Sequence, residues 1–195
     1  VAVGAGMASP IVADGRVLLL EAEGEREVVR AYEAASGQRL WQADLDTLFR
    51  DHLTPGPRAA ALADGDRIYV QSCRGEFRCL RATDGSMLWR VNFVHDLGAE
   101  FYGEVGEAAG AARHGYTAAP WLDGERLYVA AGGRRGASVV CFDKRSGRIL
   151  WRSQNDPAGY AALSLAEVAG GRQLLAFTAE ALIGLDAEDQ AFIDR

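Results

Sequence analysis

A short string ending in Leu-Trp occurs three times along the chain. Each copy reads x-Ser/Asp-Gly-x-x-Leu-Trp, and the copies occupy residues 35–41, 83–89 and 145–151. An Asp-Gly pair precedes each copy, with its Asp 25 to 28 residues before the Trp, whereas successive Trp residues are 48 and 62 residues apart. A unit with a constant core and variable connections, repeating every 40 to 50 residues or so, is typical of a β-propeller blade.

The segments inside each unit predict four short antiparallel strands. Asp-Gly between apolar runs favours a hairpin, because glycine adopts positive φ without a Cβ clash. The runs that follow, at 17–20, 68–70 and 127–129, are apolar at consecutive positions, which indicates strands buried on both faces. Third strands are expected at 28–32, 78–80 and 139–142, before the Leu-Trp strand. The chain is therefore expected to be all-β, with blades of four strands.

The Trp and the turn Gly of each unit are the candidate structural residues. A Trp at the same place in every blade offers a large apolar plate that spans the gap to a neighbouring blade, with an indole N–H free to bind a carbonyl. This docking role is favoured over ligand stacking. The predicted blade-docking residues are Trp41, Trp89, Trp151, Gly37, Gly85 and Gly147.

These units resemble the pyrroloquinoline-quinone-like (PQQ-like) propeller repeats of quinoprotein alcohol dehydrogenases and of an outer-membrane assembly lipoprotein. The family motif Ala-x-Asp-x-x-Thr-Gly-x-x-x-Trp is matched at residues 142–151 and, with one residue fewer, at 82–89. The resemblance covers most of residues 9–187 and implies a ring of about eight blades. It implies the fold strongly and the function weakly.

The whole chain, 1–195, is expected to form a partial propeller, about half of the ring. Blades are expected at 9–45, 58–92, 116–153 and 160–195. The last is predicted to begin near Gly170-Gly171 and to be incomplete, because Gln190 and Asp194 stand where Gly and Trp should fall. Since the chain also opens at Val1, we expect a longer natural protein. Missing blades or a second copy would be needed to close the ring.

Charge and hydropathy exclude two classes of partner. The formal net charge is −6, which disfavours nucleic acid. No apolar stretch is long enough to predict a transmembrane segment.

The resemblance implies a periplasmic or extracellular location in a bacterium.

Cysteine and histidine residues give no clear reactive site. Cys79 and Cys141 each lie ten residues before a blade Trp, which favours a packing role. A three-residue loop at 75–77 would place Cys73 opposite Cys79, whereas a two-residue loop would shift the register, so a disulfide stays open and unpaired thiols are favoured. The histidines are expected to be isolated loop residues.

The long connection at 91–120 is the predicted functional surface, because insertions between blades form the rims where propellers bind ligands. Its acidic, aromatic and histidine side chains are Phe93, His95, Asp96, Glu100, Phe101, Tyr102, Glu104, His114 and Tyr116. A solvated loop with no ligand is the favoured alternative, and no residue is assigned a catalytic, cofactor-binding or metal-binding role.

Two functions are compatible with these features. The favoured hypothesis is a non-catalytic binding or scaffolding platform of the cell envelope, with no cofactor in this chain and a protein or carbohydrate ligand at the rim loops. The alternative is a fragment of a PQQ-dependent alcohol or sugar dehydrogenase. By resemblance, that enzyme would use PQQ and calcium and usually a pair of adjacent cysteines, and the sequence has no Cys-Cys pair.

Overall fold

The computed structural model describes residues 3–103, 110–168, 170–187 and 192–194. Within them the strands form four antiparallel sheets of four consecutive strands each. The first sheet contains β1 (Ile11–Ala13), β2 (Arg16–Glu23), β3 (Arg26–Glu33) and β4 (Arg39–Thr47), and the second β5 (Leu62–Asp64), β6 (Arg67–Gln71), β7 (Glu76–Arg81) and β8 (Met87–Asn92). The third contains β9 (Trp121–Asp123), β10 (Arg126–Gly133), β11 (Ala137–Asp143) and β12 (Ile149–Ser153), and the fourth β13 (Ser164–Val168), β14 (Gly171–Phe177), β15 (Leu182–Asp186) and β16 (Phe192–Asp194).

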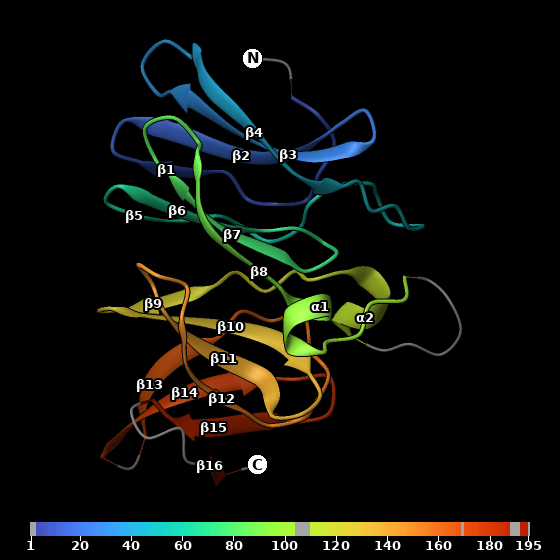
Figure 1. The fold of residues 1–195 in the computed structure, drawn as a ribbon, viewed down its shortest axis with the longest axis vertical. Helices are drawn as coiled ribbons and strands as arrows, with labels where there is room; N and C mark the ends of the chain where they lie inside the picture. The colour runs from blue at the N-terminus through green and yellow to red at the C-terminus, as the bar shows by residue number, and fades with distance from the viewer. Residues whose placement is uncertain (1–2, 104–109, 169, 188–191, 195) are drawn as a thin grey trace.

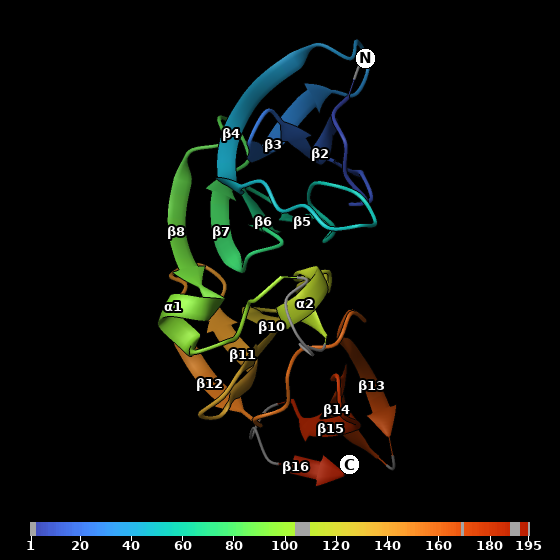
Figure 2. The same ribbon diagram turned by 90° about the vertical axis from the view of Figure 1, so that its right-hand side faces the viewer.

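The sheets stack face to face in chain order, so the two ends of the chain lie at opposite ends of the stack (Figure 1). Seen from the side, the stack is an open arc, with β4, β8 and β12 along its outer edge and β5 and β13 on the opposite side (Figure 2). No helix among the described residues is long and apolar enough to cross a membrane. The arrangement confirms the expected all-β architecture of four-stranded antiparallel blades.

The predicted turns lie where the sequence places them. Gly15, Gly65 and Gly124 follow the first strand of their sheets and have φ of 72°, 56° and 57°. The Ser/Asp-Gly turns connect the third strand to the fourth, and their glycines Gly37, Gly85 and Gly147 have φ of 71°, 72° and 71°. This left-handed conformation is accessible to glycine at little cost.

Each pair of neighbouring sheets encloses one apolar cluster, which we call a seam. The first seam joins residues of the first and second sheets, such as Leu18 and Ile68. The second joins Tyr69 to Leu127, and the third joins Tyr128 to Leu174. Because every inner sheet faces a seam on both sides, its middle strands are apolar at consecutive positions, as predicted.

A tryptophan from one sheet reaches the next sheet in the first two seams. The Trp41 indole N–H donates to the carbonyl of Ala82 at 3.0 Å. The Trp89 indole N–H donates in the same way to the carbonyl of Lys144 at 3.1 Å. Both acceptors lie directly after the third strand of the following sheet. Each bond therefore connects two neighbouring blades.

The turn glycines lie directly beneath these indoles. A Cβ atom on Gly85 would lie 2.6 Å from Cε3 of Trp41, and one on Gly147 would lie 2.6 Å from Cδ2 of Trp89. Real Cβ atoms do not approach other atoms so closely. Glycine is thus required at these two positions for two reasons: the backbone has a positive φ, and the indole ring leaves no room for a Cβ atom.

The third seam departs from this pattern. The Tyr128 hydroxyl donates to the carbonyl of Ala187 at 3.2 Å, as the Tyr69 hydroxyl donates to the carbonyl of Lys144 at 3.1 Å in the second seam. The difference is that the buried Trp151 indole N–H has no hydrogen-bond partner among the described residues. Trp151 still packs in the apolar cluster of this seam.

The fourth sheet lies within the blade predicted at 160–195. Its first strand, β13, precedes the Gly170-Gly171 turn, near which the repeat pattern of this unit is expected to start. The incomplete blade also has a fourth strand, β16, of only three residues. In β16, Asp194 lies opposite Gly184, just as Trp151 lies opposite Cys141. The register confirms that Asp194 occupies the Trp position.

The three cysteines are free and buried. In the hairpin of β6 and β7, the residue opposite Cys79 is Tyr69, while Cys73 lies in the connecting turn. The three-residue loop that would place Cys73 opposite Cys79 is therefore not formed. Cys79 and Cys141 lie opposite Trp89 and Trp151, which confirms their equivalent packing positions.

Candidate functional site

The predicted functional connection contains two short helices, α1 (Phe93–Leu97) and α2 (Ala111–His114). Phe93 and Tyr116 are fully or almost fully buried, with ring centroids 5.1 Å apart. These two aromatic residues belong to the second seam and are core residues, contrary to a role on the rim surface.

Other residues of this connection mainly hold it in place. Asp96 accepts from the backbone N–H of Asn92 at 2.7 Å, and Glu100 forms an ion pair with Arg134 at 3.0 Å. Phe101 packs edge to face on Phe49 at 5.2 Å. Tyr102 is exposed, and Glu104 lies outside the described residues.

His114 is not isolated, contrary to the sequence-based expectation. Its Nδ1 lies 3.1 Å from Oδ2 of the buried Asp51, whose Oδ1 accepts from Arg58 at 2.7 Å. The His52 and His114 rings are also in contact, with centroids 5.5 Å apart. Burial opposes ionisation of Asp51, but hydrogen bonds from Arg58 and His114 outweigh it and hold its pKa well below the usual range. This cluster ties together two connections between blades.

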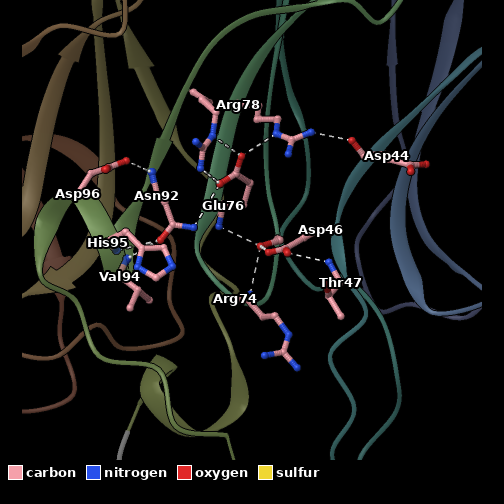
Figure 3. Close-up of polar contacts among 12 residues, drawn as sticks. Asp44, Asp46, Thr47, Arg74, Glu76, Arg78, Asn92, Val94, His95 and Asp96 are labelled. Carbon is pink, nitrogen blue, oxygen red and sulfur yellow. Dashed lines mark hydrogen bonds and ion pairs between the residues drawn. The ribbon is translucent and has the colours of Figure 1, made fainter.

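A polar hollow lies between the outer strands of the first and second sheets, and we call it the β4–β8 cleft. Its volume is about 520 Å³. A smaller adjoining hollow of about 190 Å³ shares three of its residues. The residues lining the two are Arg26, Leu45, Asp46, Arg74, Glu76, Arg78, Met87, Arg90, Asn92, Val94, His95 and Phe101. Figure 3 shows the polar contacts at this place.

Glu76 lies at the centre of the cleft and is nearly buried. Its Oε1 accepts from Arg78 Nε at 2.8 Å and from Arg90 Nε at 2.7 Å. Its Oε2 accepts from Arg90 Nη2 at 2.7 Å and from Asn92 Nδ2 at 3.2 Å. Burial alone would raise the pKa of Glu76, but these donors lower it to about 2. Glu76 is therefore a fully paired carboxylate at neutral pH.

Two contacts connect the walls of the cleft across the gap between the sheets. Arg78 donates to the backbone carbonyl of Asp44 on β4 at 2.7 Å (Figure 3). Asp46 on β4 accepts from the Ser72 hydroxyl at 2.6 Å. The Ser72 hydroxyl oxygen also accepts from the backbone N–H of Glu76, the first residue of β7, at 2.9 Å. The cleft is thus held in shape by contacts within the protein.

The side chains of Arg74 and His95 at the cleft are not held by ion pairs or side-chain hydrogen bonds to described residues. No ion pair of Arg74 and no side-chain hydrogen bond of His95 exists among the described residues, and Arg74 Nε is buried without a partner. The Arg74 guanidinium instead lies over the Phe101 ring, 5.4 Å from its centroid. His95 is exposed and lines both hollows.

Sequence reasoning missed most of this cleft, although it included His95 and Phe101 in the connection that it selected. Glu76 and Arg78 alternate with the buried Phe77, and Arg90 and Asn92 alternate along β8 in the same way. This period of two on neighbouring strands predicts one shared polar face. The pairing of β8 with β7 then brings the four side chains together.

The residues of the cleft do not suit the calcium ion that a quinoprotein site requires. Calcium takes six to eight oxygen ligands, most of them from carboxylates and carbonyls. Here the oxygens of Glu76 already accept from arginine and asparagine, and one oxygen of Asp46 accepts from Ser72. In the part of the chain that the structure describes, no group of three or more His, Cys, Asp or Glu side chains is placed to hold a metal ion.

Sequence similarity extends over most of the chain. The family model for outer membrane protein assembly factor BamB matches residues 24–194. BamB from Shewanella oneidensis is 32% identical over 66 residues, which make up 31% of this chain and 17% of that protein.

Solved structures share the fold at low identity. BamB from Moraxella catarrhalis has a TM-score of 0.65 at 14% identity, over 94% of this chain and 49% of that protein. A europium-containing methanol dehydrogenase has a TM-score of 0.67 at 14% identity, over 95% and 40%. Quinohemoprotein alcohol dehydrogenase from Pseudomonas putida HK5 has a TM-score of 0.59 at 16% identity, over 99% and 34%. The chain thus spans half or less of each relative, and these structures are alike in fold alone.

Proposed function

This chain belongs to the PQQ-like repeat family described as outer membrane protein assembly factor BamB, and on that basis we propose that it is a non-catalytic binding and scaffolding platform of the bacterial cell envelope. The observation that carries the proposal is the β4–β8 cleft. Its central carboxylate, Glu76, is saturated by donors and has a pKa of about 2, so it is a poor general base. The cleft thus holds the charged groups of Glu76, Arg78 and Arg90 in fixed positions.

The proposed ligand is a protein rather than a carbohydrate. Sugar-binding sites commonly stack a sugar ring on an exposed aromatic face. Phe101 lines the smaller hollow, but the Arg74 guanidinium lies over its ring, 5.4 Å from the centroid. Arginines beside the edge strands of two sheets suit a polypeptide, which offers both charges and backbone hydrogen bonds. We place the protein in the periplasm on the strength of the family.

The proposal also requires that the arc be completed, by further blades or by a second copy. Phe177 and Leu182 lie opposite each other in the fourth sheet and are 59% and 58% exposed, which is unusual for paired apolar residues. Covering them would remove an aggregation-prone surface. A quinone-dependent dehydrogenase remains the second hypothesis, and no contact in the cleft favours it.

Site-specific photo-crosslinking tests the proposed function. A benzoylphenylalanine at position 87, where Met87 is 53% exposed on the cleft, should crosslink in the host cell to a protein of the outer membrane or of its assembly machinery. The control position is Ile149, which is 38% exposed and holds the equivalent place on β12. Crosslinks at both positions to the same abundant proteins, or none at position 87, would contradict the proposal.

A further inference from the structure

We infer that the β4–β8 cleft binds an acidic, extended segment of a partner protein. The inference rests on the proposed function in that the ligand is taken to be a protein. It adds the chemistry of the segment that the cleft recognises, which follows from the charges and the shape of the cleft.

The cleft is cationic although the whole chain carries a net charge of −6. Two carboxylates line the two hollows, those of Asp46 and Glu76. Four arginines line the same hollows, and these are Arg26, Arg74, Arg78 and Arg90. Arg26 forms an ion pair with Asp44 at 3.5 Å, so the excess of positive charge over the two carboxylates comes from the other three arginines. Local charge decides which ligands enter a cleft, so this site attracts anionic groups in spite of the acidic surroundings.

The pairing inside the cleft leaves this positive charge available. One carboxylate, Glu76, accepts from two guanidinium groups, so Arg78 and Arg90 together carry one more charge than it neutralises. The Arg90 side chain is also 50% exposed, which leaves it accessible to a ligand. Arg74 has no carboxylate partner among the described residues, and its stacking on Phe101 fixes the guanidinium in place. A carboxylate of a ligand would supply the missing counter-charge.

The shape of the cleft suits an extended chain. β4 and β8 are each the last strand of their sheet, so each wall of the cleft ends at a sheet edge. An extended segment lying along such an edge can use backbone hydrogen bonds, while its alternate side chains point toward the walls. The main hollow and its neighbour share Asp46, Asn92 and His95, and they continue from the strands toward α1. Alternating acidic residues would thus meet successive arginines.

Fluorescence anisotropy with a fluorescein-labelled (Glu-Val)5 peptide tests this inference, with (Gln-Val)5 as the uncharged probe. We expect saturable binding of the acidic peptide that weakens with salt, and at least tenfold weaker binding of the uncharged one. The double variant R74Q/R90Q should weaken binding of the acidic peptide at least tenfold. Its matched control is R135Q/R152Q, which makes the same charge change in the third sheet, at the turn between β10 and β11 and at the residue after Trp151.

Each result decides between the alternatives, provided that both variants keep the thermal midpoint of the wild type. If the two double variants weaken binding equally, the attraction is a general charge effect and the inference is wrong. If inorganic phosphate or phosphatidylglycerol vesicles bind with the same dependence on Arg74 and Arg90 while the peptide does not, the cleft binds a phosphate group instead. If position 87 crosslinks to an envelope protein but the acidic peptide fails to bind, the proposed function stands and the acidic segment is excluded.

Discussion

Glu27 is a buried carboxyl group on β3. It is fully buried and accepts backbone N–H bonds from Cys73 at 3.1 Å and Phe49 at 3.4 Å. Burial raises its pKa to about 7 in spite of these bonds, and the nearby Asp46 adds to the rise. Glu27 thus links β3 to the turn between β6 and β7 of the next blade, and this link buries an ionisable group.

The raised pKa predicts that the free energy of unfolding falls as the pH rises from about 4.5 to about 7. The folded protein keeps its proton through this range while the unfolded chain releases it, so ionisation favours the unfolded chain. Glu27→Gln removes this penalty. Its free energy of unfolding relative to the wild type should increase across the window by an amount on the order of 3 kcal/mol. Urea unfolding at several pH values measures this, and parallel curves for the two proteins would rule it out.

At the scale of the element, the second seam between blades depends on the side chain of Trp89. Trp89→Ala should lower the free energy of unfolding by about 3–5 kcal/mol, because it removes a large ring from the second seam. That ring contacts Phe77 and Phe142, with centroids 5.5 Å and 6.2 Å away. Trp121→Ala, in β9 and 38% exposed, is the control and should cost much less. Equal urea midpoints for the two variants would refute the docking role of Trp89.

Gly85, which lies under the Trp41 ring, gives a second prediction. Gly85 and Gly15 share a φ of 72°, but only Gly85 is covered by a ring, that of Trp41. Alanine at either position is strained by roughly 1 kcal/mol. Gly85→Ala should therefore be more destabilising than Gly15→Ala, and the excess should shrink in a Trp41→Ala background. If the two alanine variants melt at the same temperature, the ring does not constrain this turn.

The repeat was sufficient to predict these elements, because a hairpin turn and a buried strand are local signals. Asp14-Gly15, Trp41 and Gly85 occupy the positions that the sequence predicts. The cleft was largely missed because its residues come from two sheets, and only the pairing of β7 with β8 and the approach of β4 bring them together. Phe93 shows the reverse error, since an aromatic residue in a long connection can belong to the core.

At the scale of the whole molecule, the open arc predicts a negative result. This chain should not bind PQQ in the presence of calcium, because a flat, polyanionic ligand needs a closed central funnel with oxygen ligands for the metal. The four sheets form an arc that is open on its inner side (Figure 2). Isothermal titration calorimetry with PQQ and calcium measures the binding. Saturable heat at micromolar concentrations would instead bring the dehydrogenase hypothesis to first place.

During synthesis on the ribosome, the indoles of Trp41 and Trp89 are each made before the carbonyl that they bind. Trp41 donates to a carbonyl 41 residues downstream, and Trp89 to one 55 residues downstream. Each blade therefore emerges before the blade that covers its tryptophan has been translated. At the usual elongation rates the delay is on the order of seconds. The pace of translation thus determines how long each nascent blade exposes an uncovered indole to water and to chaperones.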